Sequence, residues 1–319
     1  MQSVELKTVK VQRTSLNKRK WKKMLFEQRY LMLMSFPFVI WLIIFRYFPL
    51  WGWTMAFQDY KPGVPFTAQH WVGFKYFAMM FKDPEFFRVM RNTLAMSFMS
   101  LLAGFTLPVI LAIMLNEVMN NTFKRTIQTI SYLPHFVSWV VVASLFRQML
   151  SVNGIVNHIL MSLGILHESV QYLAEPHLFW IIVTIADIWK ELGWNSIIFF
   201  AAIAGIPQEL FEAATVDGAG RFKRILHITI PGIMPTLVVM LIMSIGNIIN
   251  IGFERQYLMR NDLVRDFSDV LDLYILNAGV NSGRYAFGTA IGIFKSLVSI
   301  VLVFGANRLS RKSLGYKIV

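Results

Sequence analysis

The chain has 319 residues, of which 55% are hydrophobic and only 15% are charged, and its mean hydropathy is +0.52. Soluble domains carry about 25% charged residues, so this composition excludes a disordered chain and indicates an integral membrane protein. The absence of cysteine from the sequence excludes disulfide frameworks, cysteine-ligated metal sites and thiol chemistry.

The N-terminus carries much of the net charge of +13, because nine of the 31 Lys and Arg residues precede residue 30. An apolar run follows directly. This order is typical of a cytoplasmic arm that contacts anionic membrane lipid, and a nucleic-acid-binding arm is the weaker alternative. We therefore expect a basic cytoplasmic arm over residues 1–30, a single transmembrane domain over residues 31–319, and no nucleic-acid partner.

About six stretches approach the roughly 20 apolar residues that a helix needs to cross a bilayer core. The predicted spans cover residues 31–48, 93–115, 127–149, 178–206, 235–251 and 287–309. The first stretch contains Pro37 and Arg46 and does not end in a cleavage site, so we interpret it as a retained span rather than a signal peptide. The predicted fold is an all-α polytopic membrane protein.

The distribution of basic residues orients these spans. With both termini placed inside, the inner segments carry 18 Lys and Arg residues and the longer outer segments carry nine. Cytoplasmic loops are enriched in Lys and Arg, so both termini are predicted to be cytoplasmic. The outer segment over residues 49–91 is rich in aromatic residues, which suit the membrane–water interface or, as the alternative, stacking on sugars.

The sequence nominates no catalytic residue and no metal site. It contains no Walker A loop, no His-Glu-x-x-His and no Gly-x-Ser-x-Gly, and its six histidines form no pair with the spacing of metal ligands. His135 follows Pro134 near the end of a span and is expected to bond to a backbone carbonyl.

The inner segment 207–231, between spans four and five, has the pattern of two short helices. Pro207 suits the first turn of a helix, and Asp217-Gly218 ends that helix because glycine readily adopts positive φ. A second short helix is expected to start at Arg221 and to close at Pro231. From the residues alone, this element either docks in the groove of a partner or lies on lipid as an elbow.

A sequence resemblance favours the docking interpretation. The order Glu212-Ala213-Ala214, Gly218 and Ile228-Thr229-Ile230-Pro231 resembles the signature of permease subunits of binding-protein-dependent ABC importers, with Ile230 in place of Leu as the only departure. The chain from about residue 30 onward resembles the maltose-transporter type. Asp269-Val270-Leu271-Asp272 and Thr289-Ala290-Ile291-Gly292 resemble the branch that handles oligosaccharides and polysaccharide fragments.

This resemblance implies that the chain forms half of a carbohydrate pathway in the bacterial cytoplasmic membrane and is itself not an enzyme. The implied partners are a second permease subunit, usually a different chain, two ATPases that use ATP and Mg²⁺, and an extracytoplasmic solute-binding protein. This chain would bind no cofactor. The segment 207–231 would be the coupling helix that contacts the ATPase. The residues implied in that contact are Leu210, Phe211, Glu212, Ala213, Ala214, Asp217, Gly218, Phe222 and Pro231.

Polar residues in the fifth span are candidates for the substrate pathway. Ser244, Asn247 and Asn250 recur at helical spacing. Polar residues in a membrane helix face protein or water, so a cavity and helix–helix hydrogen bonding remain equal alternatives.

The fourth span carries a second set of candidates. Asp187 and Lys190 are spaced to neutralise each other, and Gly193 is compatible with a break that would let Trp194 and Asn195 line a cavity. An anionic sugar, such as a uronate-containing fragment of alginate or pectin, also needs a cation. Lys190 and Lys295 are the candidates for that cation, and Lys295 alternatively snorkels or pairs.

Two other classes of function compete with an importer subunit. An ion-coupled secondary sugar carrier would use the intramembrane carboxylates Asp187 and Glu191, but no inverted repeat is visible. An intramembrane enzyme would need a catalytic constellation that the sequence does not show.

Overall fold

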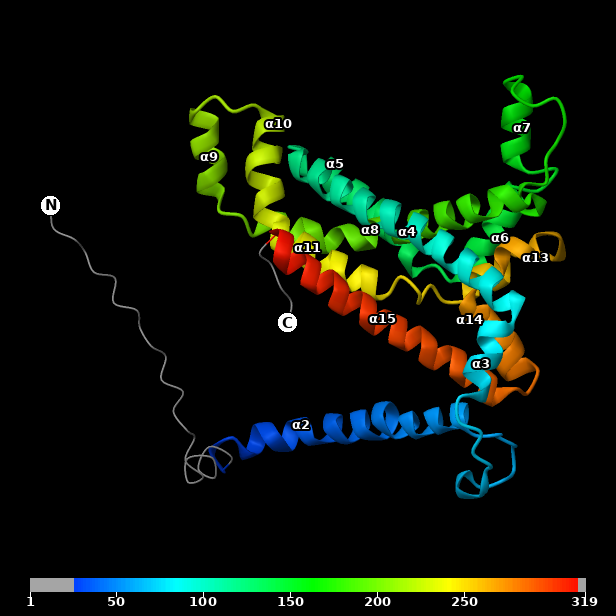
Figure 1. Ribbon diagram of the computed structural model, residues 1–319. Helices are drawn as coiled ribbons and strands as arrows, with labels where there is room; N and C mark the ends of the chain where they lie inside the picture. Colours follow the sequence, from blue (N-terminus) through cyan, green and yellow to red (C-terminus); the bar gives the residue numbers. More distant parts are fainter. Residues whose placement is uncertain (1–25, 315–319) are drawn as a thin grey trace. The chain divides into compact units, whose positions relative to one another are not determined.

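The computed structural model describes residues 26–314, and no strand occurs among them apart from a single antiparallel bridge between Gln58 and Trp71. The α-helices, labelled in part in Figure 1, are α2 (Arg29–Leu42), α3 (Lys75–Lys82), α4 (Pro84–Glu117), α5 (Asn121–Tyr132), α6 (Trp139–Met149), α7 (Ile155–Ser162), α8 (Pro176–Ala204), α9 (Gln208–Val216), α10 (Arg221–Arg224), α11 (Ile230–Gly246), α12 (Glu254–Met259), α13 (Arg265–Ser268), α14 (Leu271–Tyr274) and α15 (Tyr285–Leu314). The all-α prediction is confirmed. Residues 1–25 of the expected basic arm lie outside the described residues.

The chain divides into two units, Met1–Thr54 and Met55–Val319. The described part of the first unit consists mainly of α2, which continues through a π turn, Ile43–Tyr47. Apolar side chains cover all sides of α2, as is typical of a helix surrounded by lipid.

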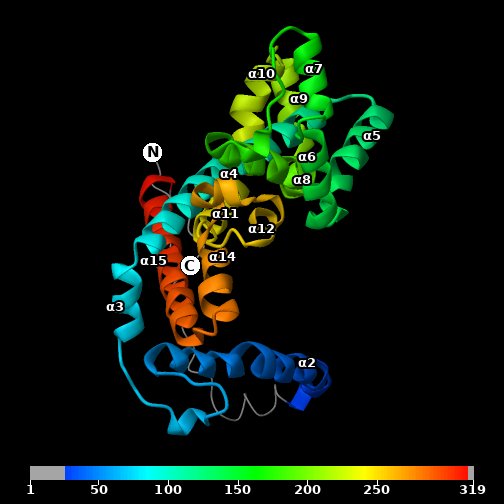
Figure 2. The same cartoon turned by 90° about the vertical axis from the view of Figure 1, so that its right-hand side faces the viewer.

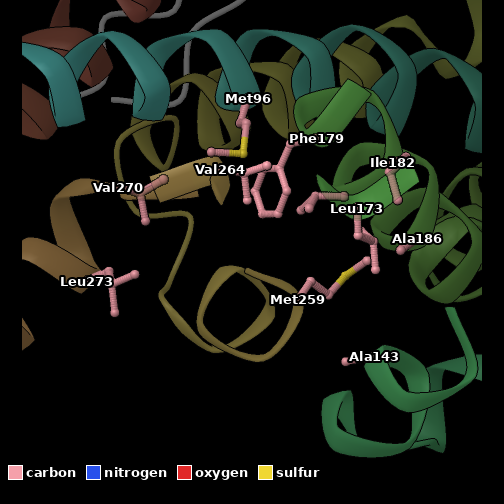
Figure 3. Close-up of a cluster of buried hydrophobic side chains, with 11 residues drawn as sticks. Met96, Ala143, Leu173, Phe179, Ile182, Ala186, Met259, Val264, Val270 and Leu273 are labelled. Atoms are coloured by element: carbon pink, nitrogen blue, oxygen red, sulfur yellow. The ribbon is translucent and has the colours of Figure 1, made fainter. Parts of the chain in front are cut away.

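The second unit is built around the packing of α4 against α8. A cluster of buried side chains joins these two helices to α6, α12 and the segment that follows α12. Figure 3 shows Met96 of α4 and Val264 beside Phe179 of α8. A second cluster packs α3 and the start of α4 against α14 and α15. These contacts fix α8 as the central helix around which the candidate sites are arranged.

The second unit has two opposite ends, and different helices and connections lie at each end. Figure 1 shows the α4–α5 connection, α9, α10 and the C-terminal end of α15 at one end, and α3, α13 and α14 at the other. Figure 2 is viewed from the second end, with α12 and α14 toward the viewer. The charge pattern predicts this separation, because it places the first group of segments inside and the second group outside.

Four helical stretches are long and apolar enough to cross a membrane, and the number rises to six if each of two bent pairs is one span. The second of these bent pairs consists of α8 and α9, which meet at an angle of 69°. The predicted number of about six spans agrees with this upper count.

The third predicted span is not one straight helix. It consists of Asn121–Phe136 and Trp139–Met149, which are bent by 102°. Pro134 cannot donate a backbone hydrogen bond, and Val137 is extended. Ser138 starts a new helix, since its side chain accepts a hydrogen bond from the Val141 amide at 3.4 Å. The predicted span over residues 127–149 is therefore interrupted by a sharp bend between two helices.

The fifth span also differs from the prediction at both ends. The helix that starts at Arg221 runs without interruption to Gly246, so Pro231 does not close it. A π turn over Ile225–Thr229 precedes Pro231 and widens the turn in which the proline ring would otherwise clash with a carbonyl. The helix ends at Gly246, before the predicted end at residue 251.

Gly193 does not break the fourth span, because α8 is continuous from Pro176 to Ala204. A Cβ atom at Gly193 would lie 2.0 Å from the backbone oxygen of Ser131 in α5. The glycine therefore permits close approach of two helix backbones, a common use of small residues between membrane helices.

Candidate functional site

The segment 207–231 forms a helical hairpin at one end of the second unit. Its first helix, α9, buries none of its residues. Gly218 has φ of +75°, in the left-handed region that glycine adopts at little cost, so the expected turn after Asp217 is confirmed. A hydrogen bond of 2.9 Å from Arg224 Nη1 to Thr215 Oγ1 joins α10 to α9. This hydrogen bond links the two helices of the hairpin, while the residues of α9 remain unburied in this chain.

Large apolar side chains project from this hairpin into open space. Val216 and Phe222 are each 88% exposed, and Leu210 and Leu226 are also exposed. Isolated exposed apolar residues are ordinary, but several on one small protruding element are typical of an interaction surface. We call the protruding segment 207–226 the α9–α10 hairpin. It contains most of the residues for which the sequence predicts a contact with a partner.

A cavity of about 410 Å³ lies within the second unit, between α4, α8, α11 and the residues that follow α11. Asn195, Ser244, Asn247 and Asn250, all predicted pathway residues, contribute to its lining. Asn250 lies beyond the end of α11 and donates a hydrogen bond of 3.1 Å to Ser299 Oγ. The structure therefore brings Asn195 of the fourth span and the three polar candidates predicted for the fifth span to one cavity.

Lys190 and Trp194 lie elsewhere, at the bend between α5 and α6. Lys190 is 5% exposed, and its Nζ donates to the His135 carbonyl at 2.5 Å and lies 3.3 Å from Glu191 Oε1. Trp194 stacks on the His135 ring with centroids 4.2 Å apart, and His135 Nδ1 lies 2.7 Å from Glu191 Oε2. The predicted Asp187–Lys190 pair and the predicted bond from His135 to a carbonyl are both wrong. The α5–α6 bend supplies closer partners that sequence spacing does not reveal.

Lys295 also lies outside the cavity lining. It pairs with Asp272, whose other carboxylate oxygen accepts a hydrogen bond of 2.9 Å from the Gly252 amide. This arrangement favours the alternative in which Lys295 pairs, and it ties α15 to the irregular segment that follows α11.

The cavity lining includes residues that the sequence argument missed. Ser97, Ser100 and Gly104 line it from α4, and their spacing over about two helical turns was a signal that could have found them. Arg255 also lines the cavity and pairs with Asp187 of α8. No local pattern identifies Arg255, since it follows α11 in a segment assigned to the outer side.

The outer segment before α3 is held by side-chain hydrogen bonds. Gln69 bonds to the backbone of Lys61 in both directions, at 2.9 and 3.0 Å, and the Tyr76 hydroxyl donates to Asp59 Oδ1 at 2.7 Å. Burial, reinforced by the hydrogen bond to Asp59, raises the pKa of Tyr76 to about 12. The same hydrogen bond holds the pKa of Asp59 below its ordinary value.

Comparison with known proteins identifies relatives over the whole chain. The family described as binding-protein-dependent transport system inner membrane component matches residues 104–315. Protein LplB of Bacillus subtilis (strain 168) is 44% identical over 293 residues, which are 92% of each chain. The polygalacturonan/rhamnogalacturonan transport system permease protein YteP of the same organism is 39% identical over 316 residues, 98% of each chain.

Solved structures give the same result. A chain in the crystal structure of a bacterial ABC transporter involved in the import of the acidic polysaccharide alginate is 40% identical, with a TM-score of 0.84. The match covers 93% of this chain and 99% of that chain. A second structure, of a bacterial alginate ABC transporter in complex with an alginate pentasaccharide-bound periplasmic protein, has a TM-score of 0.85 and 39% identity over 94% of this chain and all of that chain.

Proposed function

Because this chain belongs to the binding-protein-dependent transport system inner membrane components, we propose that it is the permease subunit of an ABC importer for a uronate-containing oligosaccharide, such as an alginate or pectin fragment. It forms half of the pathway across the bacterial cytoplasmic membrane, and a second permease chain forms the other half. An extracytoplasmic binding protein delivers the sugar. Two partner ATPases hydrolyse ATP with Mg²⁺, and this chain carries out no catalysis and binds no cofactor.

The single observation that carries this proposal is the polar cavity against α8. The side-chain amides of Asn195, Asn247 and Asn250 and the hydroxyl of Ser244 line it, and such groups donate and accept hydrogen bonds as sugar hydroxyls require. The relatives named for acidic polysaccharides support the uronate class, since they match 98% and 93% of this chain.

The α9–α10 hairpin supports the second half of the proposal. Its exposed apolar side chains, Leu210, Val216 and Phe222 among them, suit a short helical element that inserts into a groove of another protein. We propose that this groove belongs to an ATPase subunit. The uninterrupted helix from Arg221 to Gly246 connects the hairpin to the cavity.

The test is uptake by proteoliposomes that contain the full complex, loaded with ATP and supplied with the binding protein outside. We expect import of trigalacturonate or of an alginate trisaccharide that continues after an uncoupler abolishes ion gradients and stops without ATP. Import that collapses with the ion gradient and persists without ATP would instead support the secondary carrier. Import of only the carboxyl-reduced, neutral trisaccharides would refute the uronate class.

A second test isolates the hairpin. The complex is purified from membranes with wild-type chain and with a Glu212→Lys, Gly218→Pro double variant. The ATPase should co-purify with the wild type and be lost from the variant, while the second permease is retained in both. Equal recovery of the ATPase would contradict the docking role.

A further inference from the structure

Arg255 is the only cationic side chain in the described lining of the cavity. It lies on α12 and is 7% exposed. Its Nη1 pairs with Oδ1 of Asp187 in the middle of α8, and Asp187 Oδ2 lies 3.3 Å from the hydroxyl of Ser100. The cavity wall therefore contains an ion pair between a buried arginine and a half-buried aspartate, which joins α12 to α8.

The Arg255 guanidinium has hydrogen-bonding capacity that the pair with Asp187 leaves unused. A guanidinium carries five N–H donors in a planar fork, and Arg255 Nε is buried without a hydrogen-bond partner among residues 26–314. The next residue, Gln256, is fully buried, and neither its amide nitrogen nor its amide oxygen has a partner in the same range. Buried polar groups are rarely left unpaired. Of these two residues only Arg255 lines the cavity, and its unused donors therefore point to a ligand at this place.

The charges around the cavity determine what kind of ligand is suitable. Asp187 and Glu191 both line it, and Glu191 is neutralised by Lys190 at 3.3 Å and contacts His135 at 2.7 Å. Arg255 remains as the group that can attract an anion. A lone buried arginine would hold an anion too tightly for transport, since a conducting site must bind weakly enough to release. Asp187 offsets that attraction.

We propose that Arg255 determines the specificity for acidic sugars by binding a uronate carboxylate of the passing oligosaccharide through the guanidinium N–H groups that Asp187 leaves free. Asp187 stays on Nη1 and weakens the hold on the substrate. An arginine edge matches a carboxylate with two parallel hydrogen bonds, which an ammonium group cannot reproduce. The neighbouring amides of Asn195 and Asn247 bind hydroxyls and do not distinguish acidic from neutral sugars. This inference rests on the proposed uronate import.

The test compares uptake of trigalacturonate with uptake of its carboxyl-reduced counterpart in proteoliposomes of the full complex. The informative variant is Arg255→Gln with Asp187→Asn, because removing both charges together leaves no unpaired buried ion. The ratio of acidic to neutral uptake should fall at least about tenfold, the loss expected for a hydrogen-bonded charge. Arg255→Lys should retain part of the ratio.

Two further variants separate recognition from a structural role. Asp187→Asn alone leaves Arg255 charged and unopposed, so both the KM and the maximal rate for trigalacturonate should fall, because the sugar binds more tightly and leaves more slowly. Lys295→Met with Asp272→Asn neutralises a comparable pair outside the cavity lining and should leave the ratio unchanged.

The outcomes distinguish this inference from the proposed function. A wild-type ratio that favours the neutral sugar refutes uronate import itself. A wild-type preference for the acidic sugar that persists in the Arg255→Gln, Asp187→Asn variant overturns the role of Arg255. An equal loss of acidic and neutral uptake in that variant assigns the pair a structural role and also overturns the proposal.

Discussion

Replacement of Gly193 by alanine tests whether the contact between α5 and α8 holds the bend beside the cavity. The new Cβ atom would lie 2.0 Å from the Ser131 oxygen and 2.3 Å from its carbonyl carbon, both of which are backbone atoms that cannot turn aside. An ordinary contact begins at 3.4 Å, so the two backbones must separate by about 1.4 Å. That shift also loosens the contacts of His135 with Lys190 and Glu191.

Overpacking of this kind costs about 1–3 kcal/mol. For about 2 kcal/mol, the apparent Tm should fall by about 4–8 °C, which size-exclusion chromatography of the heated complex can measure. The matched control is Gly305→Ala in α15, where no heavy atom lies within 4 Å. That variant should be unchanged or slightly more stable, since alanine favours helix. Equal Tm values for the two variants would refute the close-contact explanation.

Three other predictions concern stability and assembly. Phe222→Ser should change the free energy of unfolding by less than about 0.5 kcal/mol, because the side chain is 88% exposed, yet reduce the amount of ATPase that co-purifies; a stable complex that keeps its ATPase would contradict the docking role. Lys190→Met should destabilise the chain by about 1–3 kcal/mol, since it leaves the partly exposed Glu191 without its cation, and adding Glu191→Gln should restore part of the Tm; no restoration would argue against the pair. Tyr76, whose pKa is raised to about 12 from 10.0, stabilises the outer segment fully below pH 10 and loses that contribution as the pH rises through about 12. We expect the tryptophan fluorescence of the outer segment to change as the pH rises through this range, because the segment loses that stabilisation. Tyr76→Phe should abolish the change, and an unchanged profile in this variant would exclude Tyr76 as its source.

The helical fold was predictable because a bilayer imposes a length on apolar segments, and that length is visible in the sequence. The turn at Gly218 was also predictable, since Asp217-Gly218 is a local signal for positive φ. The bend between α5 and α6 was missed. Pro134 and Ser138 mark it locally, but the apolar pattern continues through both residues and suggested one span.

Within the candidate site, the sequence predicts only those residues whose polar type is unusual in an apolar span. Asn195 and Ser244 are polar residues in apolar spans, and the cavity is where such residues are tolerated. The ion pairs were not predictable. Sequence spacing favours Lys190, one helical turn away, as the partner of Asp187, whereas the actual partner, Arg255, comes from a segment distant in sequence. The role of Gly193 could not be predicted either. A glycine in a helix permits either a break or the close approach of another helix, and only the position of the neighbouring backbone distinguishes the two.

In the proposed importer, the unbroken helix from Arg221 to Gly246 would act as a lever between the hairpin and the cavity. At about 1.5 Å per residue, Phe222 and Ser244 lie roughly 33 Å apart along its axis. A tilt of about 5° about either end therefore displaces the opposite end by about 3 Å, roughly the length of a hydrogen bond. In the proposed importer, a movement of the ATPase subunit bound to the hairpin would need to tilt this helix only slightly to exchange the hydrogen-bonding partners within the cavity.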